Sequence, residues 1–72
     1  ADPRLARLEA TIRARKGGDP ASSYVASLFA KGREKIAQKV GEEATETVIA
    51  ALSGDPDKLT SEAADLLFHM LI

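Results

Sequence analysis

The chain has 72 residues, a net charge of -1 and no cysteine. A domain this short buries only about 60% of its unfolded surface, so its own core is marginal. The lack of cysteine excludes disulfides and thiolate metal sites, which leaves an oxygen-bound metal or a partner subunit as stabilisers. Balanced charge, few aromatic residues, and no run near the roughly 20 apolar residues of a membrane span predict a cytoplasmic protein that binds neither nucleic acid nor membranes.

Three Asp-Pro pairs divide the sequence. Asp is a favoured N-cap and Pro suits the first helical position, while glycines at 17, 18 and 54 mark helix ends. No segment alternates with period two, so no strand is expected. The pattern predicts one all-α domain over residues 1–72, a short helical bundle. Its helices run from about Pro3 to Lys16, from Pro20 or Ala21 to a break at Gly32, from Arg33 to Ser53, and onward from Asp55.

Apolar residues at helical spacing predict which faces are buried. In the final helix the apolar residues surround nearly the whole circumference, which predicts burial on all sides and therefore a covering partner chain. The inward-facing residues expected in the first three helices are Leu5, Leu8 and Ile12; Tyr24, Val25, Leu28 and Phe29; and Ile36, Val40, Ala44, Thr47, Val48 and Ala51.

The third helix carries acidic residues on its apolar side. At 100° per residue, Glu43 projects about 20° from Ile36, and Glu46 about 60° further round. Glu42 lies beyond Glu46, nearer solvent. A carboxylate on a buried face is costly unless something neutralises it. Solvated pairing with lysine, such as Lys39 with Glu43 at i,i+4, is the ordinary alternative for any single glutamate.

The fourth helix carries a second acidic pair. Glu62 and Asp65 are three residues apart and share one face. A short turn at Gly54 makes the third and fourth helices antiparallel neighbours, so the two acidic pairs converge. Converging carboxylates repel one another and their pKa values rise, unless a divalent cation binds. Oxygen ligands on rigid helices favour Mg²⁺, with Mn²⁺ as a substitute.

Basic residues precede the acidic cluster. Lys31, Arg33, Lys35 and Lys39 place four of the ten basic residues within nine positions. Such cations can balance the charge of a phosphate-rich substrate, although an ordinary solvated helix face has the same composition. His69, the single histidine, lies four residues after Asp65. Its apolar surroundings favour a packed core histidine over a ligand or proton-transfer group.

Four segments of the sequence form a recognisable set: Ser22-Ser23-Tyr24, Ala30-Lys31-Gly32, the run from Lys39 to Glu46, and the run from Glu62 to Leu67. Together they resemble bacterial phosphoribosyl-ATP pyrophosphatases. The split acidic motif alone is typical of the wider superfamily of all-α NTP pyrophosphohydrolases (MazG-like and dimeric dUTPase-like enzymes). Val25 stands where that family usually has threonine. Family members also continue past the fourth helix, which predicts a chain shortened at its C-terminus.

The resemblance implies a fold, a reaction and residue roles. The fold is an interlocked homodimer in which two subunits complete each four-helix core. The reaction is Mg²⁺-dependent hydrolysis of phosphoribosyl-ATP to phosphoribosyl-AMP and pyrophosphate, the second step of histidine biosynthesis. The resemblance implies three sets of residues. The metal ligands are Glu43, Glu46, Glu62 and Asp65, and the catalytic carboxylates are Glu42, Glu43 and Glu46. The phosphate contacts are Lys31, Lys35 and Lys39. Two alternatives stay open: a house-cleaning NTP or dNTP pyrophosphatase, and a non-catalytic helical dimerisation module.

Overall fold

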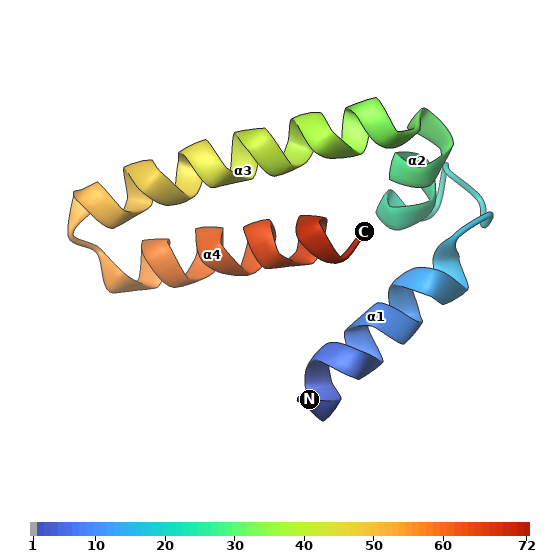
Figure 1. The fold of residues 1–72 in the computed structure, drawn as a ribbon, viewed down its shortest axis with the longest axis horizontal. Helices are drawn as coiled ribbons and strands as arrows, with labels where there is room; N and C mark the ends of the chain where they lie inside the picture. Colours follow the sequence, from blue (N-terminus) through green and yellow to red (C-terminus); the bar gives the residue numbers. More distant parts are fainter. Residues whose placement is uncertain (1) are drawn as a thin grey trace.

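The computed structural model describes residues 2–72, and Ala1 lies outside them. The described part of the chain is all-helical, as predicted, with a long hairpin and two shorter helices at its open end (Figure 1). The bounds of the helices are α1, Pro3–Arg15; α2, Tyr24–Lys31; α3, Arg33–Ser53; and α4, Pro56–Leu71. None of the described helices is long and apolar enough to cross a membrane.

The hairpin of α3 and α4 is the part of the fold that positions the acidic residues. Gly54 ends α3 in the left-handed region, at φ +76°, which lets the chain reverse within two residues. The Asp55 carboxylate then accepts hydrogen bonds from the backbone N–H groups of Asp57 (3.0 Å) and Lys58 (3.3 Å). Because the turn is short, α3 and α4 run antiparallel and pack along their length (Figure 1).

The prediction that α2 begins at Pro20 or Ala21 was wrong. The Asp19 carboxylate accepts a hydrogen bond from Ala21 N–H, and the Asp19 carbonyl accepts from Ser22 and Ser23 N–H. These bonds close a local turn around Pro20 instead of opening a helix. The helix starts three residues later, because the Ser23 hydroxyl accepts from Ala26 N–H at 3.2 Å and so serves as the N-cap.

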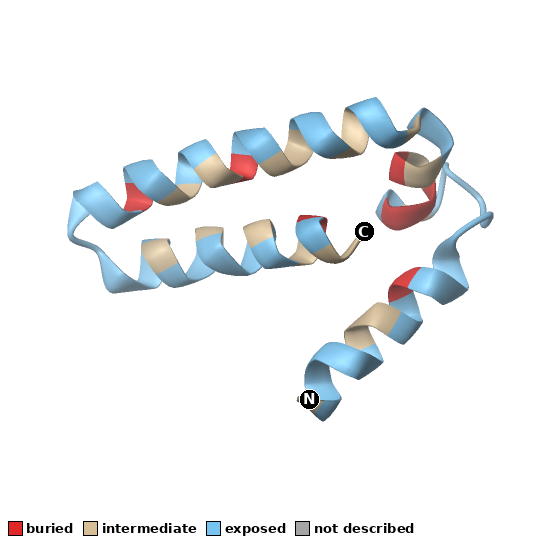
Figure 2. Ribbon diagram, viewed as in Figure 1, coloured by how far each residue is buried: buried red, intermediate tan, exposed pale blue. Residues whose placement is uncertain are grey.

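The core of the single chain is small. Its buried apolar side chains are Ile12 of α1; Val25, Ala26 and Leu28 of α2; and Ala50 of α3 (Figure 2). Since α4 covers only one side of α3, Ala50 is buried there, and the predicted burial of Val48 and Ala51 is wrong for the single chain. Tyr24 is likewise half exposed instead of packed inward.

Within the single chain α4 is not enclosed on all sides, and its burial by a partner chain stays a prediction. Leu66, Phe68 and Leu71 are half-buried, whereas Leu67 and Met70 are exposed. One neighbouring helix can cover only one face of α4, so the rest of its apolar circumference faces solvent.

Two glycines give a matched test of this hairpin. Gly54→Ala should destabilise the protein by about 1–2 kcal/mol, because alanine is strained in the left-handed region. Gly41→Ala, in the interior of α3 with open space around it, should instead stabilise by about 1 kcal/mol. Urea unfolding followed by circular dichroism measures both. Equal effects of the two substitutions would contradict the assigned turn.

Candidate metal centre

Three carboxylates meet between α3 and α4. Glu43 points from the middle of α3 into the interface with α4 and is only 8% exposed. Glu62, which is half-buried, and Asp65, which is exposed, reach it from the facing side of α4. One oxygen from each of the three side chains lies within 4.8 Å of the other two. The helical register thus brings both acidic pairs to one place.

Two oxygens in this cluster lack a hydrogen-bond partner. Glu43 Oε2 and Glu62 Oε2 are buried, and neither accepts a hydrogen bond from any residue of the described range 2–72. A buried carboxylate oxygen without a donor carries an uncompensated desolvation cost. The carboxylates therefore lack the donors that would stabilise their ionised form.

Glu46 adjoins the cluster from its solvent edge. It is exposed, and it lines the same cavity as Glu62. Burial first, and then the neighbouring Glu46 carboxyl, raise the pKa of Glu43 and likewise the pKa of Glu62. Both shifts favour the neutral carboxyl group, as expected for acidic side chains that are buried together without hydrogen-bond donors.

Glu42 and Lys39 form a separate pair at the rim. The Glu42 carboxylate accepts hydrogen bonds from Gln38 Nε2 (2.8 Å) and Lys39 Nζ (3.3 Å), which lower the pKa of Glu42. Lys39 Nζ also lies 3.8 Å from Glu43 Oε1. The hydrogen bond to Glu42 is the main reason that the pKa of Lys39 is raised. The Glu42 carboxylate thus finds its hydrogen-bond donors on its own helix, whereas Glu43 Oε2 has none in the described range.

The three basic residues singled out in the sequence lie at different distances from the cluster. Lys39 contacts it directly, and the charge of Lys35 is near enough to lower the pKa of Glu42 slightly. Lys31 is exposed at the end of α2, and no ion pair joins it to another residue within 2–72. Of these three lysines, Lys39 and Lys35 therefore lie near the acidic residues; Lys58, which the sequence did not single out, lines a cavity together with Glu46 and Glu62.

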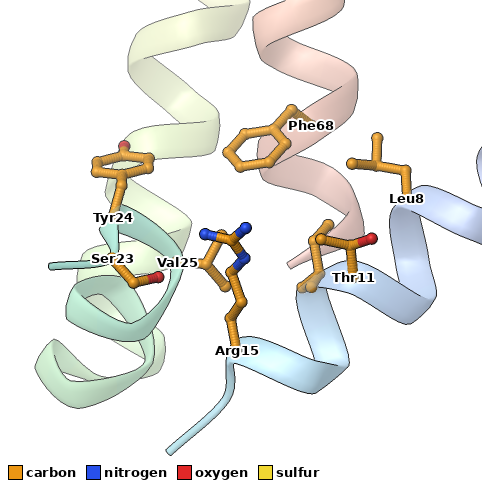
Figure 3. A pocket seen from close by; sticks show the side chains of 8 residues that line it. Leu8, Thr11, Arg15, Ser23, Tyr24, Val25 and Phe68 are labelled. Carbon is orange, nitrogen blue, oxygen red and sulfur yellow. The ribbon is translucent and has the colours of Figure 1, made fainter. Parts of the chain in front are cut away.

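Two cavities flank the site. One of about 130 Å³ opens beside the cluster and is lined by Glu46, Ile49, Ala50, Lys58 and Glu62. The other, of about 240 Å³, lies where α1 meets α2 and α4; its lining is mostly apolar and includes Arg15, Tyr24 and Phe68 but no carboxylate (Figure 3). The smaller cavity matters for chemistry, because it gives Glu46 and Glu62 access to solvent.

A hydrogen bond between Tyr24 and His69 is the feature that sequence reasoning missed. The Tyr24 hydroxyl lies 2.7 Å from His69 Nε2, and His69 is 5% exposed, in agreement with its predicted packed position. The two residues are 45 positions apart, so no local spacing could have paired them. Only the way α2 and α4 pack brings them together.

The fold and the cluster together define an all-α protein with an oxygen-only acidic site that is suited to a hard divalent cation. Residues 5–72 match the family described as phosphoribosyl-ATP pyrophosphohydrolase. The chain belongs to this family, as its motifs indicated.

Similar proteins carry a matching name. Over 68 residues, or 94% of this chain, it is 69% identical to a "Phosphoribosyl-ATP pyrophosphatase" of Novosphingobium aromaticivorans and 65% identical to one of Rhizorhabdus wittichii. Over the same share it is 66% identical to one of Dinoroseobacter shibae. The matched region covers 64%, 64% and 67% of these three relatives, so the chain spans about two thirds of their length.

The raised carboxyl pKa values predict how metal-free stability changes with pH. A carboxyl group whose folded-state pKa is raised contributes stability below its ordinary pKa and loses it as pH rises through the folded-state pKa. Glu43→Gln keeps the neutral state at every pH. With EDTA present, it should therefore raise the melting temperature at about pH 7.5, and the gain should shrink towards about pH 4.5.

Glu42→Gln is the control on the same turn of α3. The pKa of Glu42 is lowered, so its ionised form stabilises the fold above the ordinary carboxyl pKa and this contribution is lost as pH falls. Its substitution should lower the melting temperature at neutral pH. The same sign of change for both variants would contradict the different environments assigned to Glu42 and Glu43.

Proposed function

We propose that this protein hydrolyses phosphoribosyl-ATP to phosphoribosyl-AMP and pyrophosphate, the second step of histidine biosynthesis, in the cytoplasm. The observation that carries the proposal is the cluster of Glu43, Glu62 and Asp65, with its two orphaned buried oxygens, in a chain of the phosphoribosyl-ATP pyrophosphohydrolase family. The names of the similar proteins support the same substrate.

The donor set fits Mg²⁺, with Mn²⁺ as a substitute. All its atoms are carboxylate oxygens, which Mg²⁺ prefers, and they extend from two helices that hold them rigidly. A cation would supply the charge that Glu43 Oε2 and Glu62 Oε2 lack. We propose Glu43, Glu46, Glu62 and Asp65 as its ligands. When bound, Mg²⁺ would polarise phosphoryl oxygens and balance their charge.

The remaining chemistry falls to residues at the rim. Water would attack a phosphorus of the α–β link and release a proton to solvent, the bridging P–O bond would break, and pyrophosphate would leave with the electron pair. Glu42 and Glu46 face solvent, where a carboxylate can orient the water. Lys39, with Lys35 one turn earlier, would offset the charge of the departing pyrophosphate, and the exposed Lys31 is a further phosphate contact in this proposal.

We further propose that two copies of the chain associate as an interlocked homodimer. Val48, Ile49 and Leu52 of α3 are 59%, 62% and 84% exposed, and Met70 of α4 is 57% exposed. Val48, Ile49 and Leu52 are three or four residues apart or adjacent on α3, and large apolar side chains grouped in this way are uncommon on the surface of a monomer. Covering them with α3 and α4 of a second copy would complete a four-helix core around the acidic cluster.

Glu46→Gln tests the catalytic assignment. The substitution removes a charge from the solvent edge of the cluster while keeping the size of an exposed side chain. We expect pyrophosphate release from phosphoribosyl-ATP to fall at least about a hundredfold at saturating Mg²⁺, with unchanged helical content. Glu34→Gln, on the first turn of the same helix, is the matched control and should retain full turnover.

The substrate panel for this assay should include dUTP, dCTP and the common NTPs. Faster turnover of one of these than of phosphoribosyl-ATP would favour the house-cleaning alternative. Full activity in Glu46→Gln, or turnover that persists in excess EDTA, would contradict the proposed ligand set.

Leu52→Glu tests the homodimer. A charge at this 84% exposed position costs a monomer little, but it would be buried unpaired in the proposed interface. Sedimentation velocity should show dimers for the unmodified protein and monomers for Leu52→Glu. Ser61→Glu, at an exposed polar position of α4, should remain dimeric. A monomeric unmodified protein would refute the association.

A further inference from the structure

One hydrogen bond links different helices in the described range 2–72, and it lies beside the acidic cluster. It joins the Tyr24 hydroxyl, on the first residue of α2, to His69 Nε2 near the end of α4. The remaining side-chain hydrogen bonds and ion pairs of this range join residues at most four apart. The polar connection between α2 and α4 therefore rests on this pair.

The other nitrogen of His69 leads directly to a residue of the cluster. His69 Nδ1 lies 2.6 Å from the backbone carbonyl oxygen of Asp65, one helical turn earlier. A carbonyl oxygen can only accept, so Nδ1 carries the hydrogen and donates it. In the neutral ring Nε2 is then the acceptor, and the Tyr24 hydroxyl donates to it. The chain Tyr24–His69–Asp65 thus has a defined direction.

Aromatic packing holds this chain of hydrogen bonds in place. The His69 ring meets the Tyr24 ring edge-on, with centroids 5.7 Å apart, and the Phe68 ring edge-on at 5.3 Å. Tyr24 and Phe68 themselves stack at 6.3 Å across the junction of α2 and α4 (Figure 3). These contacts limit how the His69 ring can turn, so its two nitrogens stay aimed at Tyr24 and Asp65.

The junction also faces the α3 side of the cluster. His69 is near enough to Glu43 to oppose part of the rise in the pKa of Glu43. Tyr24 and His69 thus lie where α2, α3 and α4 meet, next to the carboxylates and outside the proposed ligand set.

We propose that Tyr24 and His69 are positioning residues that fix the turn of α4 carrying Asp65, so that its carboxylate stays beside Glu43 and Glu62. Without this link, that turn is held against α2 only by apolar contacts, which fix its position along the helix axis less closely than a directed hydrogen bond. This inference rests on the proposed function, because it takes the cluster as a site for a divalent cation.

Binding of Mn²⁺ alone, measured by electron paramagnetic resonance, tests the proposal. Tyr24→Phe removes one hydroxyl and keeps a ring that is half exposed, so the protein should stay folded. We expect its Mn²⁺ dissociation constant to rise about tenfold, since partners that orient ligands typically contribute that much to metal affinity. Ser27→Ala is the matched control; its hydroxyl, also on α2, donates only to the Tyr24 carbonyl. It should bind Mn²⁺ as the unmodified protein does.

A double-mutant cycle then separates positioning from packing. His69→Asn keeps an amide donor near the Asp65 carbonyl but cannot reach Tyr24. It should weaken Mn²⁺ binding, and the double variant should bind no more weakly than the weaker single variant, because either change breaks the same bond. Turnover of the variants at saturating Mg²⁺ should stay near that of the unmodified protein. Only the Mg²⁺ concentration that gives half-maximal turnover should rise.

Two outcomes would overturn the inference. Unchanged Mn²⁺ affinity with a lowered melting temperature would mean that the pair only packs the fold. Lowered turnover at saturating Mg²⁺ with unchanged Mn²⁺ affinity would mean that it acts on the substrate directly. If instead the variants weaken Mn²⁺ binding as expected but the unmodified protein does not cleave phosphoribosyl-ATP, the positioning role stands and the proposed reaction fails.

Discussion

The repulsion among carboxylates enclosed between α3 and α4 is the constraint on which the site depends. Glu43 is buried against Glu62 and Asp65, with Glu46 at the edge, and Lys39 is the one basic side chain of residues 2–72 that forms an ion pair with Glu43. A fold selected only for stability would place apolar side chains in this interface. The cost is understandable if the cluster binds a cation. The same cation would hold together two helices that share few other polar contacts.

Much of this arrangement could be predicted from the sequence because it depends on helical periodicity. The interval from Ile36 to Glu43 is almost two turns, so the apolar stripe itself places Glu43 on the buried side. The Gly54-Asp55 turn makes α4 antiparallel to α3, and the three-residue spacing of Glu62 and Asp65 places both on one face of α4. Fold class and the approach of both acidic pairs follow from these short-range rules.

The errors have a different origin, because they depend on local capping bonds and on packing between helices, which periodicity does not determine. Pro20 reads as a helix start, yet Asp19 uses its carbonyl and carboxylate to close a turn, and Ser23 caps the helix instead. Val48 has the right spacing for burial, but no element between residues 2 and 72 of the same chain covers it, and it is 59% exposed. The contact between Tyr24 and His69 likewise follows from packing alone. Periodicity predicts which face of a helix is apolar, but it does not predict which other element packs against that face.

Anomalous diffraction from crystals grown with Mn²⁺ tests the central claim most directly. The account predicts a strong anomalous peak within coordination distance of carboxylate oxygens from Glu43, Glu62 and Asp65, about 2.0–2.3 Å from each, and loss of that peak in crystals of Glu43→Gln. A peak elsewhere, or no peak in well-ordered crystals at saturating Mn²⁺, would contradict the assignment of this cluster as the metal site.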